Sequence, residues 1–596
     1  MQGAETVLGV IRERGRRGLP LERLYRQLFN KELFLVAYGR IYSNRGAMTP
    51  GVTAETVDGM SLAKIDAIIG ALRSESYRWA PARRVYIPKK HSSSGRRPLG
   101  MPPWSDKLVA EVVRMLLDAY YDVRFSDHSH GFRSGRGCHT ALGEVSRLWT
   151  GTRWFIEGDI RDCFGSLDHS VMLSILAERI HDGRFLQLIE RMLQAGYLED
   201  FRWHATLSGA PQGGIASPVL SNIYLDRLDQ FVEHTLMPEY ERGERRRKNL
   251  AYHRVRRQIQ RARQGGDRQQ ERALTQTLRR MPTQDPNDPG YRRLRYVRYC
   301  DDFLLGFAGP KYEAEEIKAK IGTFLRDELK LELSASKTLI THAASQAAHF
   351  LGYEIRTQHA DAKITDGRRM VNGTIGLFVP KTAIRERCAR YLSKGVPAQR
   401  GPLLFDEDFS IVATYGSEYR GYVQYYLLAQ DVHRLGRLRW VMETSMLKTL
   451  AAKHSSTVTT MARKYKTRIA SDDGTRVCFQ VTVPREGRKP LVARFGGIPL
   501  KRQPTAIIND RKPPQATTQG NELIHRLLAE RCELCESRTQ LHVHHVRKLA
   551  DLDKPGRPER PTWVRLMAKR KRKTLVVCAR CHQDIHAGRA TTTTRK

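Results

Sequence analysis

The sequence predicts a multidomain protein of the α+β class. Its 596 residues are too many for one hydrophobic core, so several domains are expected. Helical periodicity over residues 1–80 gives way to short apolar segments that end in acidic residues. Two Cys-x-x-Cys pairs lie near the C-terminus and are typical of a metal-binding module. Helices, a small sheet and a metal module therefore follow one another along the chain.

The charge of the chain indicates a polyanionic partner. Lys and Arg total 102 against 63 acidic residues, a formal net charge of +39. Each basic residue set against a phosphate releases counterions and gains affinity, so nucleic acid is the favoured partner. High solubility or a membrane surface would also explain the charge. No apolar window approaches the roughly 18 residues that a membrane span needs, and the basic residues are spread over the whole chain.

The cysteines indicate a reducing compartment with one metal site. Of the nine cysteines, only four are paired by spacing, which does not resemble a disulfide framework. Residues 1–17 contain no apolar core of a secretory signal. We therefore expect a protein of the cytoplasm or of another reducing compartment.

The first elements are expected to be helices followed by a strand. Leu21, Leu24, Leu28 and Val36 keep helical spacing, and residues 66–72 continue it. Residues 83–87 then alternate as in a strand, and a polar turn follows at 91–95.

Carboxylates end two further predicted strands. The apolar segment 154–160 contains Asp159, and residues 296–307 predict a hairpin with Asp301 and Asp302 at its tip. An Asp-Asp pair in a turn is by itself more often only a turn. Two Mg²⁺ ions, however, need oxygen ligands from at least two rigid elements, and these carboxylates offer them.

Residues 239–295 are crowded with Arg and Gln and close with prolines. This composition favours a solvated, partly disordered insertion. The alternative is a helical arm that contacts RNA.

Short sequence blocks, in a fixed order along the chain, indicate what kind of site these carboxylates form. They are 97–102 (RPLGMP), 131–139 (GFRSGRGCH), 159–164 (DIRDCF), 211–218 (PQGGIASP), 299–302 (YCDD), 333–338 (LSASKT) and 350–353 (FLGY). Together they resemble the reverse transcriptase family over residues 80–355. The resemblance implies a right-hand fold of fingers, palm and thumb, and an RNA-directed DNA polymerase.

The resemblance also implies roles for single residues. Asp159, Asp301 and Asp302 would be catalytic and ligate the two Mg²⁺ ions. Nucleotide-binding residues would be Lys89 and Arg97 for the triphosphate, Phe164 for exclusion of a ribose 2′-hydroxyl, and Gln212 for the nucleotide or template. If the turn is shifted, the neighbouring Lys90 and Arg96 would take the place of Lys89 and Arg97. Cys300 stands where intron-type enzymes usually have Ala, and it is small enough for activity to survive.

The segment after the palm narrows the family. Residues 418–426 (EYRGYVQYY) and 445–454 (SMLKTLAAKH) predict helices with one apolar and one basic face, which a plain helical thumb would also give. The strings are similar to domain X of group II intron maturases. That similarity implies a thumb that also grips intron RNA, through Arg420, Lys448, Lys453 and His454. Residues 469–513 are expected to be a strand-containing basic connector near target DNA.

The C-terminal cysteines, Cys532, Cys535, Cys578 and Cys581, are spaced like a closed tetrahedral Zn²⁺ site. A purely structural zinc knuckle would have the same spacing. His544-His545 and the i, i+4 pair His582 and His586 suggest more.

These residues resemble the HNH (ββα-metal) nuclease. The resemblance implies that His544, His582 and His586 bind a divalent nuclease metal and that His545 is the general base. The family's asparagine, which orients the general base, is expected near Thr574 and is missing there. A backbone carbonyl would have to orient the His545 ring in its place. The basic run 569–573 would bind DNA phosphate, or else form a solvated face.

The complete prediction is a group II intron-encoded protein. Its domains are expected at 1–80 (N-terminal helical extension), 81–365 (fingers and palm, with the insertion 239–295), 366–468 (thumb and maturase domain X), 469–525 (DNA-binding connector) and 526–596 (HNH endonuclease). It would bind its intron RNA, assist splicing, and support retrohoming by nicking target DNA and copying RNA from the new 3′ end. The expected cofactors are two Mg²⁺ ions in the palm, one divalent ion in the HNH site and structural Zn²⁺.

The expected partners are group II intron RNA, target double-stranded DNA and dNTPs, with a homodimer as an option and no membrane. The resemblance also implies a cytoplasmic protein of bacterial type, associated with the nucleoid as a ribonucleoprotein, with an organellar origin as the alternative. Two other classes of protein would share part of this pattern: an RNA-binding maturase with a vestigial polymerase, and a reverse transcriptase of another retroelement with a borrowed nuclease. The first should lack the palm carboxylates and the second the strings at 415–454, and both features are present. A non-enzymatic scaffold would explain only the charge.

Overall fold

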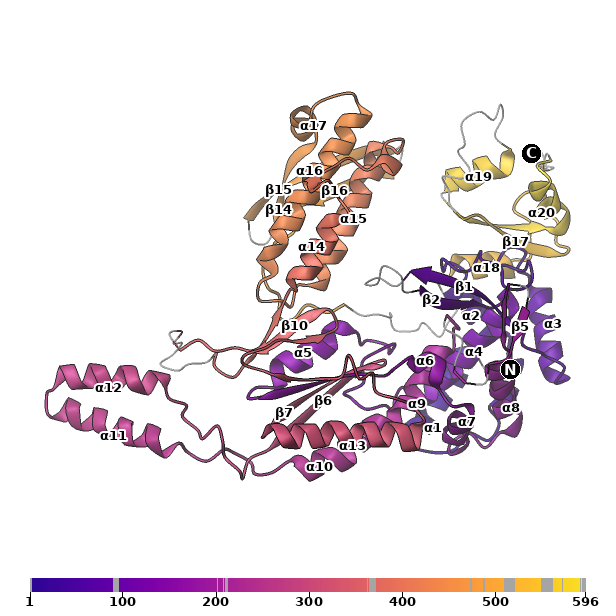
Figure 1. Cartoon of the computed structure of the whole chain (residues 1–596). Coiled ribbons are helices and arrows are strands. Elements are labelled where there is room, and N and C mark those ends of the chain that lie inside the picture. The colour runs from indigo at the N-terminus through magenta and orange to yellow at the C-terminus, as the bar shows by residue number, and fades with distance from the viewer. Residues whose placement is uncertain are drawn as a thin grey trace.

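The structure is a computed structural model (Figure 1). It describes residues 3–88, 96–200, 202–206, 208–209, 213–361, 363, 371–471, 474–485, 488–508, 520–547, 561–570, 572–589 and 591. Among these residues no helix combines the length and apolar character needed to cross a bilayer.

The N-terminal part is helical, as predicted. Its elements are α1 (Ala4–Arg16), η1 (Tyr25–Phe29), α2 (Lys31–Ile41) and α3 (Leu62–Arg73), and they share one apolar core with α4 (Trp104–Tyr121). The fingers sheet has the order β2-β1-β4-β5, and its strands are β1 (Ala82–Pro88), β2 (Arg96–Met101), β4 (Tyr197–Glu199) and β5 (Arg202–His204). The predicted strand at 83–87 is therefore confirmed, and the polar turn at 91–95 lies outside the described residues.

The palm is an antiparallel sheet of order β6-β7-β3-β8. Its strands are β3 (Trp154–Asp159), β6 (Arg293–Tyr299), β7 (Asp302–Ala308) and β8 (Leu339–His342). Helices around it are α5 (Cys138–Leu148), α6 (Cys163–Ser166), α7 (His169–Ala177), α8 (Gly183–Gln194), α9 (Ser217–Phe231) and α13 (Lys311–Leu329). Both predicted strands with terminal acids are confirmed, because β3 ends at Asp159 and β7 begins at Asp302.

The insertion is helical, so the expectation of partial disorder was wrong within the described residues. After η2 (Val232–Leu236) and α10 (Met237–Tyr240) it forms a hairpin of α11 (Leu250–Gln264) and α12 (Arg268–Arg280). Figure 1 shows this hairpin projecting away from the palm. No residue of α12 is buried, so the arm is solvated although it is folded. Asn249 and Asp267 cap the two helices by accepting hydrogen bonds from backbone N–H groups.

The thumb is built on a second apolar core. Its elements are β9 (Ala348–Phe350), β10 (Tyr353–Thr357), β11 (Ile375–Phe378), α14 (Lys381–Ala389), β12 (Leu392–Ser393), β13 (Val396–Pro397), η3 (Gly401–Leu403), α15 (Asp408–Tyr425), η4 (Val432–Leu435), α16 (Gly436–Lys453) and α17 (Val458–Tyr465). A three-stranded sheet, β14 (Lys466–Ser471), β15 (Gly474–Arg485) and β16 (Arg488–Gly496), continues it.

The expected boundary between residues 468 and 469 falls inside β14. Phe479 and Phe495 of the sheet lie in the same core as Tyr415 and Tyr419 of α15. The strands up to residue 496 therefore belong to the thumb and are not a separate connector.

The C-terminal module consists of α18 (Glu522–Leu528), β17 (Leu541–His545), α19 (Thr562–Arg570), β18 (Thr574–Cys578) and α20 (Ala579–His586). It lies on the N-terminal helices, with α18 beside α2 (Figure 1). Leu523, Ile524 and Leu527 of α18 are buried in the same core as α2, so this contact is apolar and well packed.

Candidate active sites

The palm carboxylates meet at one end of the palm sheet. Asp159 and Asp302 are directly paired residues of the antiparallel strands β3 and β7, and Asp301 precedes Asp302 in the hairpin turn. Cys300 has a positive φ of 58°, which lets the turn present both acids in succession. The structure thus brings together the three residues that the sequence predicted as a metal site.

The electrostatics of this triad suit a cation site. Burial, together with the charges of Asp301 and Asp159, raises the pKa of Asp302 to about 7. Burial and Asp159 also raise the pKa of Asp301. Lys337 lies at the rim and donates a hydrogen bond from Nζ to Asp159 Oδ2 at 2.9 Å. Because like charges at close range are costly, two divalent cations would relieve a repulsion that the fold imposes on the free carboxylates.

A buried ion pair holds the hairpin that carries these acids. Arg298 of β6 donates to Asp229 of α9 from Nε at 2.7 Å and from Nη2 at 2.5 Å, and both side chains are 0% exposed. The same guanidinium donates to the carbonyl of Cys300 at 3.0 Å and to Ser129 Oγ at 2.9 Å. Sequence reasoning missed this pair, because a strand arginine reads as a surface position until its partner is known.

The 131–139 block supports the turn from the other side. A Cβ on Gly131 would lie 2.5 Å from both the backbone N and the Sγ of Cys300, so only glycine fits. Asn222 Nδ2 donates to the Gly131 carbonyl at 2.9 Å. This block is therefore an architectural support for the catalytic turn.

The predicted nucleotide-binding residues are placed in part. Arg97 on β2 is exposed, and its charge opposes the rise in the pKa of Asp301. Phe164 is half-buried in α6. Lys89 and Gln212 lie outside the described residues. Gly213 has a φ of 100°, and a Cβ there would meet Leu99 of β2 at 2.6 Å, so the described part of the 211–218 block reaches the fingers strand that carries Arg97.

The tyrosines of the 418–426 string bind the turn between β9 and β10, at the place where α15 also meets α5 of the palm. Tyr425 donates to the carbonyl of Leu351 at 2.6 Å, and Tyr426 donates to that of Gly352 at 3.0 Å. His139 Nε2 lies 2.7 Å from the carbonyl of Tyr425. Three blocks that the sequence analysis identified separately thus meet at one junction.

The predicted RNA-contacting residues divide into two kinds. Arg420 is exposed on α15, and Lys448 is half-buried on α16. Lys453 Nζ pairs with Asp408 Oδ1 at 2.7 Å, and His454 Nε2 lies 2.9 Å from the same carboxylate. Lys453 and His454 therefore have a structural partner in this fold.

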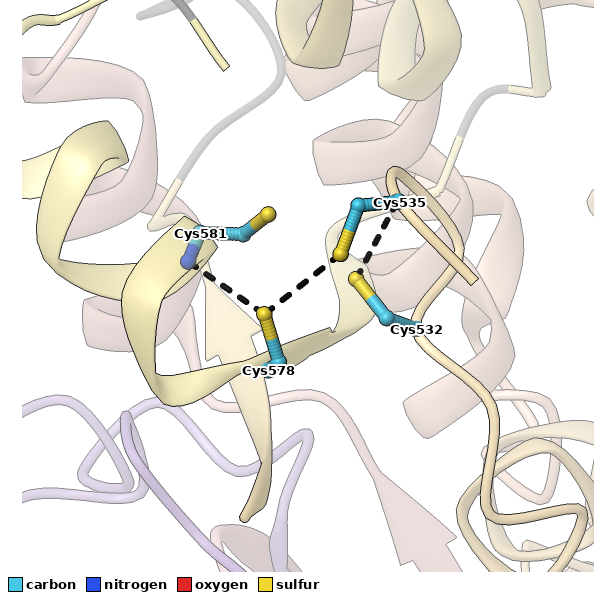
Figure 2. A group of neighbouring side chains, drawn as sticks. All are labelled: Cys532, Cys535, Cys578 and Cys581. Atoms are coloured by element: carbon cyan, nitrogen blue, oxygen red, sulfur yellow. Dashed lines mark hydrogen bonds between the residues drawn. The ribbon is translucent and has the colours of Figure 1, made fainter. Parts of the chain in front are cut away.

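The four C-terminal cysteines form one cluster, called the tetracysteine cluster below (Figure 2). Their Sγ atoms all lie within 4.8 Å of one another. Cys535 Sγ and Cys578 Sγ are 3.6 Å apart, and the backbone N–H of Cys581 donates to Cys578 Sγ at 3.5 Å. Four thiolates at this spacing suit a tetrahedral Zn²⁺ ion.

A second cluster gathers the predicted histidine ligands, and it includes one residue that the sequence did not suggest. Asp58, His544, His582 and His586 each offer a ligand atom within 4.8 Å of the others. They are called the histidine cluster below. His544 is 4% exposed, and both of its ring nitrogens lack a hydrogen-bond partner. Its Nδ1 faces Asp58 Oδ1 at 3.4 Å, so the buried imidazole is placed to act as a metal ligand beside this carboxylate.

His545 is not part of this cluster. Successive strand residues face opposite sides, and the His545 ring lies on the face opposite His544, in contact with the rings of Tyr38 and Tyr42. Its Nε2 is 3.5 Å from the Tyr38 hydroxyl, and its Nδ1 is 3.3 Å from the Val543 carbonyl. Burial lowers the pKa of His545 to about 4, which keeps the ring neutral.

Thr574 does not take the place of the family's asparagine. It pairs with His545 across β17 and β18, and its Oγ1 accepts a hydrogen bond from Arg526 Nη2 at 2.8 Å. A backbone carbonyl, that of Val543, lies beside Nδ1 of His545 instead.

Three family models match the chain in the order of these domains. Residues 87–355 match reverse transcriptase (RNA-dependent DNA polymerase), residues 370–476 match type II intron maturase, and residues 532–582 match the AI2M/AI1M-like HNH endonuclease. The fold and its sites thus define a reverse transcriptase that carries a maturase domain and an HNH endonuclease domain.

Similar proteins identify the family. The chain is 37% identical to the group II intron-encoded protein LtrA of Lactococcus lactis subsp. cremoris, over 94% of this chain and 95% of that protein. It is 34% identical to a 91 kDa protein in the cob intron of Schizosaccharomyces pombe, over 95% of this chain and 69% of that one. It is also 31% identical to the COX1/OXI3 intron 1 protein of Saccharomyces cerevisiae, over 94% and 68%. The chain belongs to the group II intron-encoded proteins.

Proposed function

We propose that this protein binds the intron RNA that encodes it, assists its splicing, and then supports retrohoming into DNA. In retrohoming the RNA inserts into one DNA strand, the HNH domain nicks the other, and the palm copies the RNA from the new 3′ end. The observation that carries the proposal is the direct pairing of Asp159 with Asp302 beside Asp301, next to a maturase domain and a nuclease domain.

In the palm, Asp159, Asp301 and Asp302 would hold two Mg²⁺ ions. Bound there, the ions lower the pKa of the attacking 3′-hydroxyl and stabilise the leaving pyrophosphate. Arg298 keeps the turn in place through the Cys300 carbonyl, so both acids stay aligned with Asp159. Arg97 approaches from the fingers, where its charge would meet the triphosphate.

Other residues of the palm and fingers would select and position the nucleotide. Phe164 would lie under the sugar and exclude a ribose 2′-hydroxyl. Lys89 and Gln212 remain proposals from the sequence, for the triphosphate and for the nucleotide or template.

In the nuclease domain, His544, His582 and His586 would hold one divalent ion. Such an ion polarises the scissile phosphate. The Val543 carbonyl beside Nδ1 orients the ring of His545 and leaves its Nε2 to take a proton from water. The Tyr38 hydroxyl lies at that nitrogen, on the face opposite His544, so the His545 side chain has to leave this contact and turn toward the metal site before it can act as the base. The tetracysteine cluster would hold a structural Zn²⁺ ion.

The RNA-binding surface is proposed on the thumb and on the arm. Arg420 is exposed, and α11 and α12 carry many arginines on a solvated hairpin. These arginines are on the surface, so they can bind phosphates without any unpacking of the apolar core.

The experiment that tests the proposal separates the activities. Asp301→Ala should abolish cDNA synthesis and leave assisted splicing of the intron unchanged, because the RNA-binding surface lies elsewhere. Asp327→Ala, which removes an exposed carboxylate of α13, is the matched control and should leave both unchanged. Equal loss of splicing in a folded Asp301→Ala protein would contradict the separation of functions. Likewise His545→Ala should remove only second-strand nicking, and unchanged nicking would contradict its role as base.

A further inference from the structure

The N-terminal region contributes a carboxylate to the nuclease site. Asp58 lies in the loop between α2 and α3, far along the chain from the histidines. Its Oδ2 is 2.8 Å from His586 Nε2, and its Oδ1 is 3.3 Å from His582 Nε2 and 3.4 Å from His544 Nδ1. One side chain thus faces all three imidazoles.

The position of this carboxylate is set by the backbone on both sides of the interface. The residues after Asp58 form a bridge with β17, in which Gly59 N donates to Val543 O at 3.0 Å and Val543 N donates to Met60 O at 2.8 Å. The backbone N–H of His545 donates to Asp58 Oδ1 at 2.7 Å. The Asp58 side chain is 12% exposed. Asp58 therefore differs from a mobile surface acid that happens to meet a histidine.

The donor set at this point fits a transition metal. Three imidazoles and one carboxylate suit Zn²⁺ and its first-row neighbours, such as Co²⁺ and Ni²⁺. The two Nε2 atoms of His582 and His586 are only 3.2 Å apart, and His544 offers two buried nitrogens without hydrogen bonds. A cation among these atoms would satisfy all four side chains at once.

We propose that Asp58 is the fourth protein ligand of the nuclease metal, supplied to the HNH module across its interface with the N-terminal helices. The inference rests on the proposed role of the three histidines. Because one ligand comes from the other side of the interface, metal binding and docking of the module on α2 stabilise each other by the same factor. The metal thereby joins the two ends of the chain.

Cobalt binding to the full-length protein tests this assignment. The tetracysteine cluster is first loaded with Zn²⁺, excess Mg²⁺ occupies the palm carboxylates, and the visible absorption of Co²⁺ is then titrated. Loss of an outer partner of a metal ligand already weakens binding about 10- to 100-fold, so Asp58→Asn should weaken Co²⁺ binding at least about tenfold. Asp66→Asn, an exposed acid of α3, is the matched control and should bind as the unchanged protein does.

A second variant reports coordination directly. Asp58→Cys places a thiol at the same position, and a thiolate-to-cobalt charge-transfer band should appear in this variant and not in the unchanged protein. Hydrogen exchange of residues 541–545 without metal checks that each variant is still docked, and added Co²⁺ should slow it in the unchanged protein but not in Asp58→Asn.

His582→Ala distinguishes an error in the assignment of Asp58 from an error in the histidine site itself. If His582→Ala loses Co²⁺ binding while Asp58→Asn keeps it and Asp58→Cys shows no thiolate band, Asp58 is not a ligand and the histidine site stands. If His582→Ala binds Co²⁺ as before, the proposed nuclease site itself is wrong.

Discussion

Replacement of Asp229 by Asn should destabilise the palm far more than the loss of a surface ion pair. In the folded protein Asp229 accepts two hydrogen bonds from Arg298, and neither side chain has any exposure. Asparagine keeps the shape and one acceptor but removes the negative charge. The guanidinium of Arg298 then stays buried and charged without its paired carboxylate.

The size of the effect follows from this burial. Breaking a buried pair by removing one partner costs about 3–5 kcal/mol. The pair of Arg161 with Glu332 is the matched control, since its side chains are 75% and 70% exposed at 3.5 Å. Glu332→Gln should cost less than about 1 kcal/mol, because solvent screens such pairs.

Peptide-resolved hydrogen exchange measures the loss of stability in β6 and β7 separately from the rest of the chain. Such a local measurement suits a protein of several domains. Each 1.4 kcal/mol is about a tenfold change in an equilibrium constant, so amides of β6 and β7 should exchange about 100- to several-thousand-fold faster in Asp229→Asn. Exchange in the thumb should not change. Equal, small effects of Asp229→Asn and Glu332→Gln on β6 and β7 would refute the reasoning that burial makes this pair costly to break.

Further predictions concern the thumb and the zinc site. Gly416→Ala should lower the melting temperature because its Cβ would lie 2.0 Å from a backbone carbonyl. Gly421→Ala in the same helix meets no atom within 4 Å and should raise the melting temperature slightly, because alanine stabilises a helix by up to about 1 kcal/mol relative to glycine. Arg420→Ala should weaken intron RNA binding at low salt without changing the melting temperature, whereas Lys453→Ala should lower the melting temperature as well, since it removes a partner of Asp408. A strong chelator should remove zinc from the tetracysteine cluster and speed hydrogen exchange in the C-terminal module, with the palm unchanged.

The palm and the tetracysteine cluster were predictable from sequence because their signals are local. The palm acids stand at the ends of apolar strands, and the cysteines have the spacing of a zinc site. The opposite directions of His544 and His545 also follow from strand geometry, since neighbouring strand residues face opposite sides. The sequence therefore predicts that the two rings point apart. It does not predict which residues each ring contacts.

Asp58 and Asp229 could not be predicted, because their roles exist only through distant partners. Asp58 is separated from His582 by 524 positions, and Asp229 from Arg298 by 69. Nothing in the residues around Asp58 is typical of a metal ligand. Register in a sheet or packing of one domain on another decides such contacts.

The helices of the insertion had a usable signal that composition concealed. Arg, Gln, Ala and Leu are good helix formers, and Asn249 and Asp267 stand at cap positions before each run. The high charge density by itself predicts disorder. The hairpin accounts for both the helix-forming residues and the high charge, since its two helices pair with each other while no residue of α12 is buried.

The packing of the C-terminal module on α2 also sets an order of events during synthesis. Tyr38 and His545 are 507 positions apart, and a ribosome adds about 5–20 residues per second. The N-terminal helices therefore wait about half a minute or longer with an apolar face open, until α18 emerges to cover it. In that interval the arginines of α11 and α12 are already exposed, so RNA near the ribosome can reach them before the C-terminal module docks.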